Sequence, residues 1–175
     1  MRLPNKPMDM TTQEVGFISS ILNKDDTALE YGSGSSTLYF SKYVKNYYSI
    51  EHVKAWHNTV SSQAQSNTKI FHAECFFLDN NIHCDYTSED HKLKWEPYVK
   101  KVHELPCSKY DKILIDGRAR AYCAVEVLGY LDIDGLLMIH DYTHRPKYHN
   151  IVESLYKKIN IVDSLAIFSK KCTTI

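Results

Sequence analysis

Apolar residues follow two different spacings along the chain, and the two spacings alternate. Residues 27–31, 47–50, 110–117 and 136–141 are short, mostly apolar runs of the length of a strand. After each run, apolar residues recur every three or four positions, which is the period of an α-helix. Strands that alternate with helices predict an α/β fold, with a doubly wound, mainly parallel sheet and helices on both faces.

An arm and a leading helix precede this regular pattern. Residues 1–10 contain two prolines and predict an irregular arm. Thr11 and Glu14 have the spacing of a capping box, which predicts a helix over residues 11–23. The sequence shows no linker and no internal repeat, so all 175 residues are expected to form a single domain.

Further elements are predicted between the second and fourth runs and near the C-terminus. Residues 69–77 predict a third strand, residues 79–91 a polar loop and residues 95–105 a helix. Residues 161–162 and 166–168 are expected to add two last strands, which makes seven. A helix is predicted after each of the last two runs. The first has apolar spacing at Ala121, Ala124, Leu128 and Leu131, and the second at Val152, Leu155 and Ile159.

Charge and cysteine content narrow the classes of protein. Basic and acidic residues both number 21, so the formal net charge is zero and no binding to nucleic acid is expected. No apolar run approaches the roughly 20 residues of a membrane helix, and the N-terminus lacks the apolar centre of a secretory signal. Five irregularly spaced cysteines indicate reduced thiols, so a cytoplasmic protein is expected. The oligomeric state is left open.

Acidic residues follow the predicted strands at the point where each strand ends. Glu30 and the glycines 32 and 34 stand at the first strand, and Glu51 and His52 follow the second. Asp116 ends the fourth strand, and His140 with Asp141 ends the fifth. A doubly wound sheet binds its ligand beyond the carboxyl ends of its strands, so these side chains are expected to share one site.

The spacing of the first two strand ends predicts a site for a nucleoside. Gly32 and Gly34 let a ligand lie against the main chain, and Glu51 is placed to accept both hydroxyls of a ribose. A nicotinamide dinucleotide site would have a third glycine where this chain has Thr37. Glu30 beside the glycines suits a cationic sulfonium or ammonium ligand better than a pyrophosphate. An NAD-dependent oxidoreductase or epimerase remains an alternative.

Residues 30–37 have the sequence Glu-Tyr-Gly-Ser-Gly-Ser-Ser-Thr. This segment resembles the first motif of the class I S-adenosylmethionine-dependent methyltransferases. Glu51, Asp116 and Asp141 match acidic positions after later strands of that family. The resemblance covers roughly residues 27 to 160 and implies S-adenosylmethionine (SAM) as cofactor. It also implies a strand order of 3-2-1-4-5-7-6 with the last strand antiparallel. The residues expected to bind the cofactor are Glu30, Gly32, Gly34, Ser35, Ser36, Glu51, His52 and Asp116.

Asp116, His140 and Asp141 are the candidate catalytic residues. Small metal-dependent O-methyltransferases of this family are partly similar at these positions. They have an Asp after strand four and an Asp-Asn or Asp-Asp pair after strand five, where this chain has His140 and Asp141. The resemblance therefore implies a divalent metal, such as Mg²⁺ or Mn²⁺, held by Asp116, His140 and Asp141. Such an ion would lower the pKa of an acceptor hydroxyl. In a reaction without a metal, Asp116 or His140 would act as general base.

A basic and aromatic rim is expected to bind the acceptor. Arg118, Tyr142, His144 and Arg145 follow the fourth and fifth strands and suit a sugar, a glycan or another small polar molecule. These features favour SAM-dependent O-methylation of an acceptor hydroxyl, with or without a metal. The second alternative is a SAM-binding subunit without turnover.

Overall fold

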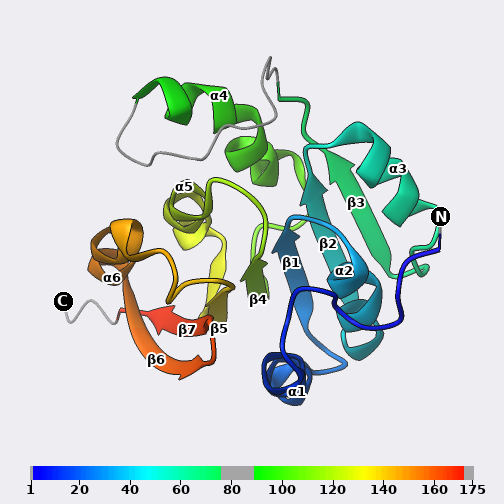
Figure 1. Cartoon of the computed structure of the whole chain (residues 1–175), viewed down its shortest axis with the longest axis horizontal. Coiled ribbons are helices and arrows are strands. Elements are labelled where there is room, and N and C mark those ends of the chain that lie inside the picture. The colour runs from blue at the N-terminus through cyan, green and yellow to red at the C-terminus, as the bar shows by residue number, and fades with distance from the viewer. Residues whose placement is uncertain (1, 76–88, 172–175) are drawn as a thin grey trace.

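The computed structural model describes residues 2–75 and 89–171, and these residues form a seven-stranded sheet between helices (Figure 1). The strand order is β3-β2-β1-β4-β5-β7-β6. Strands β1 to β5 pair in parallel, whereas β7 runs antiparallel to both of its neighbours, β5 and β6. The α/β class, the seven strands and the order inferred from the resemblance are therefore confirmed.

The elements have the following bounds. The strands are β1 (Thr27–Tyr31), β2 (Asn46–Glu51), β3 (Thr68–His72), β4 (Tyr110–Ile115), β5 (Leu131–Ile139), β6 (Tyr156–Val162) and β7 (Leu165–Lys170). The α-helices are α1 (Thr12–Ile21), α2 (Ser35–Phe40), α3 (Lys54–Ser61), α4 (Glu89–Val99), α5 (Arg120–Glu126) and α6 (His149–Leu155). Short 3₁₀ turns η1 (Ser41–Tyr43), η2 (Lys100–Glu104), η3 (Val127–Gly129) and η4 (Pro146–Tyr148) adjoin them.

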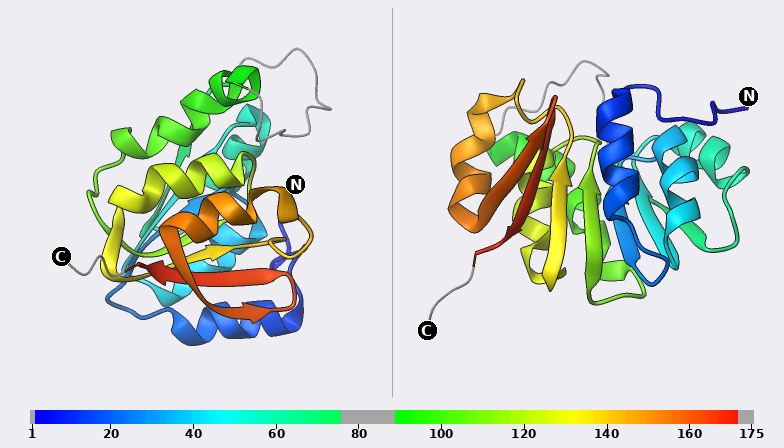
Figure 2. Two further views of the ribbon diagram at one scale, coloured as in Figure 1. Left: turned by 90° about the vertical axis from the view of Figure 1, so that its left-hand side faces the viewer. Right: turned by 90° about the horizontal axis from the view of Figure 1, so that it is seen from below.

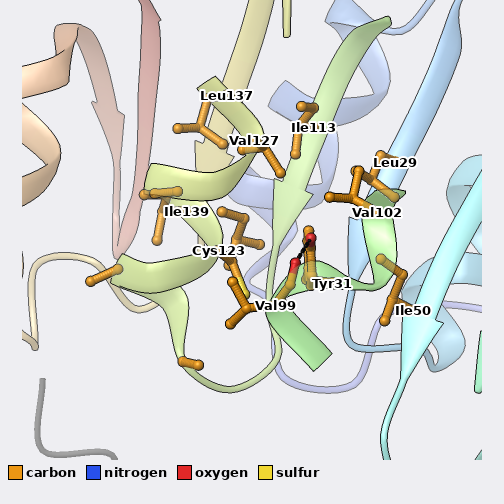
Figure 3. Close-up of a cluster of buried hydrophobic side chains, with 14 of the residues drawn as sticks. Leu29, Tyr31, Ile50, Val99, Val102, Ile113, Cys123, Val127, Leu137 and Ile139 are labelled. Carbon is orange, nitrogen blue, oxygen red and sulfur yellow. Dashed lines mark hydrogen bonds between the residues drawn. The ribbon is translucent and has the colours of Figure 1, made fainter. Parts of the chain in front are cut away.

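Successive residues of the central strands face opposite sides of the sheet, and each side has its own core. In β4, Ile113 and Ile115 pack with α4, α5 and α6, whereas Leu114 packs with α1 and α2. Figure 2 shows α1 on the side of the sheet opposite to α4, α5 and α6. Figure 3 shows the first core, where the Tyr31 hydroxyl donates a hydrogen bond of 2.6 Å to the carbonyl of Val99.

The strand register brings the predicted site residues to one edge of the sheet. Tyr31 pairs with both Ile50 and Ile115, and Ile115 pairs with Ile139. These four residues form one row across the sheet, so the residues that follow them emerge side by side. Parallel pairing in this register is thus the reason that segments far apart in the sequence meet.

The loops after β1 and β4 touch through two glycines. Gly32 has a φ of +91°, and a Cβ added there would lie 2.7 Å from the Cα of Gly117. Gly34 has extended backbone, and its nearest neighbours would be at ordinary contact distances of 3.9 Å or more. Gly32 is therefore required by the fold, whereas Gly34 is not.

Several predicted boundaries are wrong because helical spacing continued by chance into neighbouring strands. Leu131 and Ile159 were expected in helices, but Leu131 begins β5 and Ile159 lies in β6. Residues 132–135 of β5 form a bulge against β4. Strand β6 is at the edge of the sheet and Ile159 is 48 % exposed. The distance of Ile159 from Val152 and Leu155 in the sequence therefore did not mark a buried helix face.

The stretch around residue 90 also differs from expectation. Helix α4 begins at Glu89, inside the predicted polar loop, and it ends at Val99. The rest of that loop, residues 79–88, and the last residues of the predicted third strand, 76–77, lie outside the described residues. The leading helix is confirmed, with both capping-box hydrogen bonds between Thr11 and Glu14. In the described part of the chain, no helix has the length and apolarity that crossing a membrane requires.

A pair of substitutions tests the contact between the two loops. Gly32→Ala should lower the free energy of unfolding by about 2–4 kcal/mol, because the new Cβ meets Gly117 and the backbone is left-handed. Gly34→Ala is the matched control and should change it by less than about 1 kcal/mol. Urea unfolding followed by circular dichroism measures both, and equal losses would contradict the assignment.

Candidate functional site

A cavity of about 340 Å³ opens where the loops after β1, β2, β4 and β5 meet. Residues 7–10 of the N-terminal arm form part of its wall. Its volume lies within the roughly 300–1,000 Å³ that is usual for small-molecule sites. The predicted site residues that line it are Gly32, Gly34, Ser35, Ser36, Glu51, His52, Asp116, Arg118, His140, Asp141 and Arg145.

Glu51 is buried at the end of β2 with both oxygens held. Its Oε2 accepts a hydrogen bond of 3.0 Å from the backbone N–H of Ser33, and Oε1 accepts one of 2.7 Å from the N–H of Val53. Burial raises the pKa of Glu51, but His52 and these two N–H groups outweigh it and hold the pKa below its usual value. The cavity therefore has a fixed anion on its β2 side.

Trp56 is a wall residue that the sequence did not reveal. Its spacing with Val53 and Val60 predicted only the face of a helix. In α3, Trp56 instead lines the cavity beside Glu51, and its indole N–H donates a 2.5 Å hydrogen bond to the carbonyl of Ser33. The indole ring thus adds an apolar surface beside the Glu51 carboxylate.

Glu30 lies behind the glycine loop and not in the cavity wall. The hydroxyls of Ser36 and Thr37 donate hydrogen bonds of 2.6 and 2.5 Å to its two oxygens. Burial is complete and raises the pKa of Glu30 to about 8, although these hydroxyls lower it. Near neutral pH Glu30 is thus mostly a neutral acid that fastens the start of α2 to β1.

The N-terminal arm packs against the same helix. The backbone N–H of Met8 donates a 3.2 Å hydrogen bond to the hydroxyl of Ser35, and Figure 1 shows the arm, in dark blue, running past α2. The irregular arm predicted from its prolines therefore contributes to the site.

His140 lies between two carboxylates at the other end of the cavity. Its Nδ1 is 2.8 Å from Asp116 Oδ1, and its Nε2 is 3.4 Å from Glu14 Oε2 on α1. Burial lowers the pKa of His140, but Asp116, Asp141 and Glu14 outweigh it and raise the pKa above its usual value. Glu14 was expected only to cap the leading helix, and its contact across the sheet edge was not predictable from spacing.

Arg120, which the sequence places with Arg118 among the basic residues after the fourth strand, is held inside the site. It begins α5, is 6 % exposed, and places one terminal nitrogen 3.1 Å from Asp141 Oδ2 and 3.5 Å from Asp116 Oδ1. The same guanidinium donates hydrogen bonds to the carbonyls of Gly117 and His140. The two candidate catalytic carboxylates are therefore joined by an internal cation.

Asp141 is held in a strained position. Its φ is +54°, which is uncommon for a residue other than glycine. Burial raises its pKa, but the charges of Arg120 and His140 and a hydrogen bond from Arg145 hold the pKa below its usual value. The ion pairs compensate for the backbone strain and fix the carboxylate at the cavity edge.

The three predicted metal ligands are not arranged around an open metal site. Asp116 and Asp141 face Arg120, and both ring nitrogens of His140 face carboxylates. Among residues 2–75 and 89–171, no group of three or more His, Cys, Asp or Glu side chains could hold a metal ion. The residues present do not fit a divalent ion, so we derive no step through a metal.

The predicted acceptor-binding residues divide into two groups. Arg118, which is exposed, and Arg145 line the cavity. Tyr142 does not: it is buried, stacks on His149 and donates a 2.9 Å hydrogen bond to Glu153. His144 is exposed and lies outside the cavity wall.

Comparison with known proteins finds likeness in structure only. No protein-family model and no curated protein matches the sequence. A methyltransferase-like protein from Silicibacter pomeroyi superposes with a TM-score of 0.77 at 21 % identity, over 95 % of this chain and 89 % of that one. A putative caffeoyl-CoA O-methyltransferase from Staphylococcus aureus gives 0.65 at 14 % identity, over 95 % and 86 %.

A third structure was determined with a ligand. It is a putative methyltransferase from Streptococcus mutans in complex with S-adenosylhomocysteine (SAH), with a TM-score of 0.58 at 15 % identity, over 94 % of this chain and 100 % of that one. These likenesses establish that the chain has the fold of the SAM-dependent methyltransferases, as the resemblance of its first motif implied.

The buried Glu30 gives a testable dependence of stability on pH. The folded protein keeps the Glu30 proton up to about pH 8, whereas the unfolded chain releases it near pH 4.5. The free energy of unfolding should therefore fall as the pH rises between these values. Glu30→Gln removes this loss, so at pH 8 it should be more stable than the wild type by on the order of 1–3 kcal/mol.

Urea unfolding at several pH values from 5 to 8 measures the effect. The difference between the two proteins should be small at pH 5 and grow towards pH 8. Glu104→Gln, at an exposed position in η2, is the control and should keep the pH dependence of the wild type. Parallel curves for wild type and Glu30→Gln would show that the Glu30 carboxyl is ionised in the fold.

Proposed function

We propose that the protein is a methyltransferase that binds SAM in the 340 Å³ cavity and transfers its methyl group to a hydroxyl of a small polar acceptor. The observation that carries the proposal is the pairing, in one cavity, of the Gly32–Gly34 loop with the buried, ionised Glu51. The loop suits the amino acid end of SAM, and Glu51 suits the ribose hydroxyls. Trp56 suits the adenine ring.

Asp116 follows the neighbouring strand β4 and lines the same cavity, so it would lie beside a cofactor held in this way. The acceptor oxygen attacks the methyl carbon in line while the carbon–sulfur bond breaks, and SAH leaves. The hydroxyl proton passes to the Asp116 carboxylate, the general base of the proposal. His140 and Arg120 hold this carboxylate in place, so the enzyme contributes mainly position and orientation.

The acceptor site is proposed beside Arg118 and Arg145, at the open edge of the cavity. Two guanidinium groups favour an acceptor with hydroxyl and acidic groups, such as a sugar, a glycan unit or a phosphorylated small molecule. A cytoplasmic location agrees with the reduced thiols of Cys75 and Cys107.

Calorimetry with SAH tests the cofactor site directly. Glu51→Gln should weaken SAH binding about 10–100-fold, because a hydrogen bond to a charged group contributes about 1.5–3 kcal/mol. Glu104→Gln, which removes an exposed carboxylate elsewhere, should leave the affinity unchanged. Failure of the wild type to bind SAH, or binding of NAD in its place, would overturn the proposal.

Measuring turnover together with SAH affinity distinguishes the general base from the residues that bind the cofactor. Asp116→Asn should reduce SAH release in the presence of a panel of sugars, sugar phosphates and catechols by about 100-fold or more. Its SAH affinity should stay within a few fold of the wild type, because the reacting proton plays no part in binding. An equal loss of SAH affinity in Asp116→Asn and Glu51→Gln would contradict their separate roles. If the wild type binds SAH but shows no turnover, the protein is a binding subunit and the proposed activity is wrong.

A further inference from the structure

We propose that the guanidinium of Arg120 is the resident cation of this site, in the place that a divalent ion would need between Asp116 and Asp141. It follows that SAM binding and methyl transfer by this chain proceed without a metal. The claim about SAM binding and methyl transfer rests on the proposed function. The claim that Arg120 occupies the position of a divalent ion does not depend on it.

Arg120 lines the cavity, and its donors are bonded to groups of the protein. One terminal nitrogen lies between the two carboxylates, 3.1 Å from Asp141 and 3.5 Å from Asp116. The other donates to the carbonyl of His140, and Nε donates to the carbonyl of Gly117 at 3.0 Å. A side chain that is 6 % exposed and bonded in this way is a fixed part of the site and acts as a positioning residue.

The loop before α5 directs this side chain inwards. Ala119 is buried in the left-handed conformation, with a φ of +51°. The chain therefore turns sharply between two arginines, and Arg118 is exposed whereas Arg120 is buried. The strain at Ala119 is offset by the bonds that Arg120 makes with the ends of β4 and β5.

A divalent ion and Arg120 cannot both occupy this position. An ion that bridged Asp116 and Asp141 would lie about 2.1 Å from an oxygen of each carboxylate, within the space of the Arg120 nitrogen. The third expected ligand is engaged as well, since the ring nitrogens of His140 face Asp116 and Glu14. A positive charge therefore already lies between the two carboxylates.

Manganese binding tests the proposal on the purified wild-type protein. Titration with Mn²⁺, followed by the paramagnetic signal of the free ion, should show no site with a Kd below about 1 mM. The Kd for SAH should change less than about twofold between buffer with EDTA and buffer with Mn²⁺. A stoichiometric Mn²⁺ site that Asp116→Asn removes, or SAH binding that requires the ion, would overturn the inference.

A double-mutant cycle tests whether Arg120 acts through the carboxylates. Arg120→Met should lower the urea midpoint of unfolding, because it removes the buried cation that two neighbouring carboxylates share. The decrease should be smaller when Asp141→Asn is also present, whereas a role in packing alone would give the same decrease in both backgrounds. Arg118→Met, at the exposed position two residues earlier, is the control and should leave the midpoint unchanged.

The outcomes separate this inference from the proposed function. Absence of SAH binding in every buffer would end the proposed function, whatever the Mn²⁺ result. SAH binding together with a Mn²⁺ site at Asp116 would keep the proposed function and end the inference about Arg120. If Arg120→Met does not fold, the Mn²⁺ and SAH titrations of the wild type still decide the question.

Discussion

The site depends on how five carboxyl groups are kept together at one edge of the sheet. Neighbouring carboxylates repel one another, and the structure compensates these groups in several ways. Glu30 keeps its proton and accepts two hydroxyl hydrogen bonds, whereas Glu51 accepts backbone N–H groups. Asp116 and Asp141 share Arg120.

The fifth carboxylate, Glu14, links the leading helix to this edge. It accepts hydrogen bonds from the backbone and hydroxyl of Ser164 and lies 3.4 Å from His140. Burial raises its pKa, yet these bonds and that of Thr11 hold the pKa below its usual value. One side chain thus caps α1, contacts the loop before β7 and orients a residue of the cavity wall.

The two halves of the cavity differ in chemical character, and this difference supports the proposed positions of cofactor and acceptor. The half beside β1 and β2 holds a glycine loop, a fixed anion and an indole ring, as a nucleoside site requires. The half beside β4 and β5 holds paired charges, with two further arginines at its rim. A cofactor in the first half and an acceptor in the second would meet near Asp116.

Local sequence determined the central strands, the capped leading helix and the order in which acidic residues end the strands, because alternation and capping depend on neighbouring residues. It misjudged β5 and β6, where a bulge and an exposed edge remove the signal of a buried face. The structure gives Glu14, expected only as a helix cap, a contact with His140, and it places Trp56 and Arg120 in the cavity wall. Their roles were decided by the parallel register and by the left-handed turn at Ala119, which exist only in the folded chain. Glu14 contacts Ser164, which is 150 positions away, so no local spacing within the sequence could encode this part of the charge compensation.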